Sequence, residues 1–147
     1  MKFFGPPPMP SNRPPRLYYP VVGDRVWYKG WRAMKAEALR RLTLRTEVHT
    51  QALGQPMPAV AVADAKGRWG SCRPGVRGGP PAIRYSWRLA LAPYAVADYV
   101  AAHECAHLLE LNHGPRFWAH VQALVGDHRR HREWLRAEGA RLHAFGR

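Results

Sequence analysis

The sequence predicts a domain of the α+β class, in which a small β-sheet packs against helices. Three observations favour this class. A helical pattern of apolar residues comes first, two short segments with apolar residues at alternate positions follow, and three further helical patterns complete the chain. With 147 residues, the chain is long enough to bury a core without disulfide bonds. We expect residues 21–147 to form a single domain.

The first twenty residues differ from the rest of the chain in composition. Seven of the 14 prolines lie there. Because proline fixes φ and has no N–H donor, this stretch cannot hold a helix or a central strand. Residues 1–20 are therefore predicted to be a disordered tail. The segment 21–28, with its valines and aromatic residues, is expected to form a short strand or hairpin.

The first predicted helix begins at Trp31 and ends near Gly54, which two prolines follow closely. The apolar residues on its buried face recur three or four positions apart: Trp31, Met34, Ala38 and Leu42.

Two strands are predicted after this helix. In the first, Val60 and Val62 alternate with alanines. In the second, apolar residues stand at every second position from Ile83 to Leu89. The segment 73–81 between them is rich in glycine and proline and is expected to be a loop.

Three helices complete the predicted fold. Pro93 suits the first position of a helix, and the apolar pattern that follows extends this helix to about Leu111. Pro115 begins the next helix, which ends at Gly126. Asp127 is expected to cap a last, basic helix.

The helix after Pro93 carries the pattern His-Glu-x-x-His, from His103 to His107. Two histidines four positions apart lie on one helical face, about 6 Å from each other, so both imidazoles can reach one metal ion. Glu104 is close enough to hold a water molecule on that ion without being a ligand itself. The pattern therefore predicts a catalytic zinc site with Glu104 as general base.

The third ligand is expected to be His113, although Glu110 also lies on this face. Glu110 is seven residues from His103, about 10 Å along the helix axis, and would have to reach roughly 7 Å back toward the metal. His113 lies beyond a break at Asn112, where the turning chain can bring its imidazole over the site. We therefore expect His103, His107 and His113 to bind one Zn²⁺ per chain, with water in the fourth position. Glu110 is expected to accept a hydrogen bond from a ligand N–H.

Two further motifs accompany this site: Arg-Trp-Gly-Ser-Cys at residues 68–72 and Trp-Arg-Leu at residues 87–89. Together with the histidine motif and Phe117-Trp118, they resemble the YgjP-like metallopeptidase family, which is related to the SprT-like and WLM metalloproteases. The resemblance covers residues 31–135. It implies a zincin-like fold, zinc ligation by the three histidines, and peptide hydrolysis.

Substrate contacts are predicted around the first of these motifs. A glycine-flanked turn beside a strand allows close approach of a backbone, and zincins bind peptide as an added strand along such an edge. Arg68 or Tyr85 is expected to stabilise the oxyanion.

The composition bears on partners and compartment. The chain has 23 basic and 10 acidic residues, a formal net charge of +13, which predicts weak, nonspecific binding of nucleic acid. Two functions other than peptide hydrolysis are therefore kept as alternatives. The protein could be a zinc-dependent hydrolase of a non-peptide substrate such as a nucleotide, or a nucleic-acid-associated, SprT-like protein.

No apolar stretch is long enough to span a membrane. With two cysteines and no apolar signal segment, the expected location is the cytoplasm.

Overall fold

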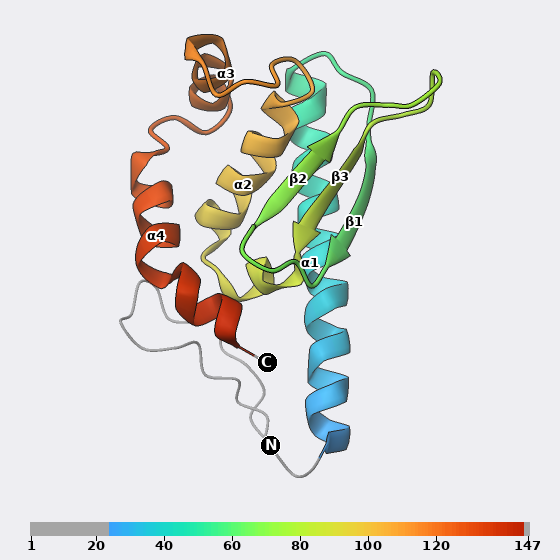
Figure 1. Ribbon diagram of the computed structural model, residues 1–147, viewed down its shortest axis with the longest axis vertical. Coiled ribbons are helices and arrows are strands. Elements are labelled where there is room, and N and C mark those ends of the chain that lie inside the picture. The colour runs from blue at the N-terminus through green and yellow to red at the C-terminus, as the bar shows by residue number, and fades with distance from the viewer. Residues whose placement is uncertain (1–23, 146–147) are drawn as a thin grey trace.

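The computed structural model describes residues 24–145, and the side chains from residue 30 to residue 145 (Figure 1). The elements are α1 (Asp24–Ala52), β1 (Ala59–Ala63), β2 (Gly70–Arg73), β3 (Ala82–Ser86), the 3₁₀ helix η1 (Trp87–Leu91), α2 (Tyr94–Ala106), α3 (Pro115–Val125) and α4 (Arg129–Ala144). This architecture confirms the α+β class. The tail expected at residues 1–20 lies outside the described residues. Between residues 24 and 145, no helix combines the length and apolar character needed to cross a bilayer.

The three described strands form one mixed sheet in the order β1-β3-β2. Strand β1 is parallel to β3, and β2 is antiparallel to β3. Helices α1 and α2 lie against one face of this sheet (Figure 1). Along β3, Ile83 and Tyr85 are buried whereas Arg84 between them is exposed. This alternation gives the sheet an inner face toward the helices and an outer face toward solvent.

The strand predicted to run to Leu89 instead ends at Ser86. The hydroxyl oxygen of Ser86 accepts a hydrogen bond from the backbone N–H of Arg88 at 3.2 Å and caps η1. All five residues of η1 are buried, so the alternating apolar residues there do not mark one face of a strand. Trp87 and Leu89 are instead part of the core.

Two other predictions about strands are wrong, since one expected strand is helical and one expected turn is a strand. Helix α1 already begins at Asp24, within the segment expected to be a strand or hairpin. The helical spacing of Trp27, Trp31 and Met34 continues the apolar pattern of α1 toward the N-terminus and outweighs the local β-propensity. Conversely, β2 forms where a turn was expected. Its four residues have no apolar alternation, and β2 exists because β3 offers it an edge for pairing.

The helix boundaries are partly as predicted. Helix α2 ends at Ala106, short of Leu111, and turns bonded from residue i to i−3 follow it. Helix α3 begins at Pro115, and Gly126 follows its last residue with φ at 75°. The Asp127 carboxylate accepts a hydrogen bond from the Arg129 N–H at 3.1 Å, which satisfies one donor at the start of α4.

A partly buried ionic cluster joins α1 to α2. The Asp98 carboxylate lies 2.6 Å from Nε2 of the buried His49 and accepts a hydrogen bond from Nε of Arg45 at 2.7 Å. Burial alone would raise the pKa of Asp98, but the hydrogen bonds to His49 and Arg45 outweigh it and lower this pKa below its usual value. The charged form of Asp98 therefore stabilises the packing of the two helices.

We expect Asp98→Asn to lower the free energy of unfolding by about 1–3 kcal/mol at neutral pH, because it leaves His49 buried without its charged partner. The pKa of Asp98 is lowered in the folded state, so its contribution is present above the unfolded value of about 4 and is lost as pH falls through the folded value. The stability difference between wild type and variant should therefore shrink in acid. Denaturant unfolding at several pH values measures this. Asp127→Asn, at an exposed ion pair, serves as control and should have a much smaller effect.

Candidate metal centre

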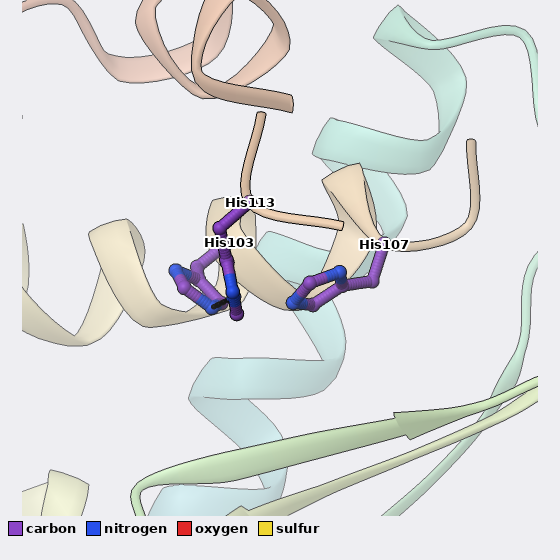
Figure 2. Close-up of side chains that lie close together, drawn as sticks. All are labelled: His103, His107 and His113. Carbon is purple, nitrogen blue, oxygen red and sulfur yellow. Dashed lines mark hydrogen bonds between the residues drawn. The ribbon is translucent and has the colours of Figure 1, made fainter. Parts of the chain in front are cut away.

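Three histidine side chains converge at the end of α2. His103 lies in the last turn of α2, His107 directly follows that helix, and His113 reaches both from the loop before α3 (Figure 2). One nitrogen from each ring lies within 4.8 Å of the other two. The ring centroids are 4.7 to 5.1 Å apart. The structure thus brings together the three side chains that could hold one metal ion.

Two aromatic residues in the first turn of α3, Phe117 and Trp118, pack against this cluster. Phe117 is fully buried, and its ring centroid lies 4.8 Å from His103, 4.5 Å from His107 and 4.9 Å from His113. The indole N–H of Trp118 donates a hydrogen bond to the main-chain oxygen of His113 at 3.2 Å. The early end of α2 and the start of α3 at Pro115 therefore fix the loop that carries His113.

Hydrogen-bond partners orient two of the imidazoles. Nδ1 of His107 lies 3.0 Å from the main-chain oxygen of Glu110, so it can donate a proton there and leave Nε2 as the free electron-pair donor. Glu110 thus contacts the cluster as an acceptor, through its backbone. The hydroxyl of Tyr99 lies 3.4 Å from Nδ1 of His103. The sequence analysis missed Tyr99, although its position four residues before His103 places it on the same helical face.

Burial and mutual proximity favour the neutral form of His103 and His107. Burial, together with the neighbouring His107 and His113, lowers the pKa of His103 to about 3. Burial also lowers the pKa of His107, with a smaller contribution from His113. Neutral imidazoles have the free electron pair that a metal ion requires. At neutral pH this donor set fits a transition metal ion of the zinc type.

Glu104 is buried beside this cluster. The residue is 5% exposed, and Oε1 lies 3.9 Å from Nε2 of His103. Oε2 is buried without a hydrogen-bond partner among the described residues. Burial raises the pKa of this carboxyl to about 7. A carboxyl whose pKa is raised toward neutral pH suits a group that accepts and returns protons.

The sheet approaches Glu104 at Gly70, the first residue of β2. A Cβ atom at Gly70 would lie 2.9 Å from Cγ and 3.1 Å from Cδ of Glu104. Only glycine leaves room for the buried carboxylate at this distance. The Arg-Trp-Gly-Ser-Cys motif thus contributes a backbone surface against which Glu104 packs, a role that the sequence analysis did not assign to Gly70.

The remaining predicted site residues lie elsewhere. Tyr85 is 1% exposed, and its hydroxyl lies 2.7 Å from that of Thr46. Its oxyanion role is wrong, because this hydroxyl is buried between the sheet and α1. Arg68 is exposed and lines a pocket on the sheet with Arg73 and Arg84, and no contact joins it to the three histidines in the described part of the chain.

We expect Gly70→Ala to destabilise the fold by about 1–3 kcal/mol, because the added methyl group overlaps the Glu104 side chain in a packed interior. Denaturant unfolding measures the change. Gly114→Ala is the matched control, since a Cβ there meets no heavy atom within 4 Å and φ is −88°. Equal stability of the Gly70 variant and wild type would contradict the close packing of Gly70 on Glu104.

One of three comparisons with known proteins finds a match for this chain. No curated protein and no solved structure matches the chain. The family model described as the YgjP-like metallopeptidase domain matches residues 26–138, which include all three histidines, Glu104 and the whole sheet. The four helices and three-stranded mixed sheet described between residues 24 and 145 are consistent with a zincin-like fold. The chain therefore belongs to the YgjP-like metallopeptidase family.

Proposed function

We propose that this protein is a zinc-dependent peptidase that binds one zinc ion through His103, His107 and His113. The observation that carries this proposal is the convergence of three imidazole nitrogens within 4.8 Å, beside a buried carboxylate. Three nitrogen ligands leave a fourth position open, which is typical of catalytic rather than structural zinc. Zinc, when bound, supplies Lewis-acid polarisation of a scissile carbonyl and increases the acidity of water.

Glu104 acts as the general base in this proposal. Its carboxylate accepts a proton from the attacking water and transfers that proton to the departing amine, so that the C–N bond of the peptide is replaced by a carboxylate and a free amine. The raised pKa of about 7 supports both steps, because a group of this strength can take up and release a proton at neutral pH. Its position next to His103 keeps it near the reacting atoms.

A peptide substrate fits the arrangement of β2. Strand β2 pairs only with β3 in the described sheet, so its other edge offers unpaired backbone groups. The first residue of this strand, Gly70, packs on Glu104. An extended peptide that adds to this edge would pass close to the general base. No comparable feature beside the histidines favours a nucleotide substrate.

His113 is proposed as the third ligand because its imidazole lies close to that of His103. Its Nε2 lies 3.3 Å from Nε2 of His103, whereas Glu110 meets the cluster through its main-chain oxygen on His107. The Glu110 side chain is therefore not needed as a ligand. Its main-chain contact would persist after substitution of the carboxylate.

Glu104→Gln should leave the fold and the zinc content nearly unchanged while reducing peptide turnover by about 10²–10⁴-fold, because general-base catalysis is removed and the ligands remain. Zinc content by elemental analysis and turnover of a peptide library measure the two effects. Turnover by the variant at the wild-type rate would show that Glu104 is not the base.

The ligand assignment predicts a ranking of zinc retention in the presence of a chelator. His113→Ala should lose zinc, and its melting temperature should fall toward that of the metal-free protein, because ligand binding and folding are linked. Glu110→Gln should retain zinc. His120→Ala, a histidine outside the cluster, is the matched control and should also retain it. A Glu110 variant that loses zinc beside a His113 variant that keeps it would reverse the assignment.

A further inference from the structure

The basic residues of this chain are unevenly distributed relative to its acids. Between Asp64 and Asp98 the sequence contains no aspartate or glutamate, whereas it contains six lysines and arginines. They are Lys66, Arg68, Arg73, Arg77, Arg84 and Arg88. This stretch forms β2, β3, the loop between them and η1. The fold therefore concentrates positive charge on one part of the surface.

The register of the sheet brings two of these arginines together on the outer face. Ser71 of β2 lies directly opposite Arg84 of β3. Arg73, two positions after Ser71, faces the same side and is a diagonal neighbour of Arg84. Both side chains are exposed, and neither forms an ion pair with a side chain described between residues 30 and 145. Two unpaired like charges side by side indicate a surface that meets an anion.

A pocket lies beside this pair. Its volume is about 240 Å³, and Arg68, Arg73, Arg84 and the half-buried Ser71 line it. Asp64 is the acidic residue in its wall. The carboxylate of Asp64 is bonded to the buried guanidinium of Arg88, so it does not neutralise the three exposed arginines. The pocket thus offers several cationic donors to one anionic group.

Arginines on the helices are in a different situation. Several of them pair with a nearby acid: Arg40 with Glu37, Arg45 with Asp98, Arg129 with Asp127 and Arg141 with Glu138. The helices thus offset part of their positive charge with acids, whereas the sheet stretch contains no acid between Asp64 and Asp98.

The shape of this region suits an extended polyanion. The loop between β2 and β3 projects beyond the helices (Figure 1), and it carries the exposed Arg77. The outward positions of the three strands hold alanine, serine and arginine. These small side chains leave the arginines accessible, and no aromatic residue at these outward positions offers a base a stacking partner.

We propose that the outer face of the sheet and the β2–β3 loop bind nucleic acid through its phosphate backbone. Guanidinium groups recognise phosphate oxygens with paired N–H donors. Contacts of this kind carry no sequence information, so binding is nonspecific and strongly salt-dependent. Adjacent residues of β2 point to opposite faces, and Gly70 faces Glu104. The nucleic-acid surface is therefore on the other side of the sheet from the general base, and this inference does not depend on the peptidase proposal.

The test compares two triple variants of the full chain that lose the same charge. Arg73→Gln/Arg77→Gln/Arg84→Gln changes the sheet surface, and Arg116→Gln/Arg130→Gln/Arg136→Gln changes exposed arginines of α3 and α4. Affinity for a fluorescent DNA duplex is measured by anisotropy between about 50 and 200 mM salt. The sheet variant should bind about tenfold or more weakly, and its slope of log affinity against log salt should fall by about 2–3. The helix variant should lose less than about threefold, as expected for a long-range field alone.

Equal losses in the two variants, or no binding by the wild type at the lowest salt, would overturn the proposal. Thermal melts of both variants confirm that they are folded. If the sheet variant does not fold, hydrogen exchange of the wild type with and without the duplex decides the matter, with protection expected in residues 70–86 and not in α4. Vesicles containing phosphatidylserine test the competing partner. Arginine-dependent binding to these vesicles that exceeds binding to DNA would assign the face to a membrane and overturn the proposal.

Discussion

The packing of Glu104 on Gly70 is the contact on which the arrangement of the site depends. Helix α2 contacts the sheet on one side, and its histidines lie on the side that meets α3. Glu104 is adjacent to His103 along the chain, about 100° around the helix, and so falls at the boundary between these two sides. Because Gly70 has no side chain, the start of β2 can pack directly on the Glu104 side chain without displacing it. The same packing helps to bury the carboxylate, and burial raises its pKa to about 7.

Two other charged groups among the described residues, the partly buried Asp98 and the buried Arg88, differ from Glu104 in having partners. Asp98 is bonded to His49 and Arg45. Arg88, fully buried, donates to the main-chain oxygen of Phe145 at 2.9 Å and to the carboxylate of Asp64. Buried charge is normally compensated in this way, because desolvation is costly. Oε2 of Glu104 is buried without such a partner. A buried carboxylate that does not stabilise the fold in this way is typical of a functional site.

The sequence predicted the parts of the site that depend on local spacing. His103 and His107 are related by one helical turn, and Pro115 and Gly126 bound α3 through their own backbone preferences. Contacts between distant segments could not be predicted in this way. Strand β2 has no pattern of its own and forms through pairing with β3. The support that Phe117 gives to the three rings depends on the angle between α2 and α3, which no local pattern specifies.

The register of β2 connects the far end of the sheet to Glu104. A slip of one residue would place Trp69 or Ser71 where Gly70 now lies, and either side chain would overlap the carboxylate. In an antiparallel pair the connecting loop fixes the register. That loop is tightly closed, since a Cβ at Gly75 would overlap the carbonyl oxygen of Gly79. The β2–β3 loop therefore helps to position the Glu104 carboxylate beside the histidines. It does so because it sets the register in which Gly70 pairs with Tyr85.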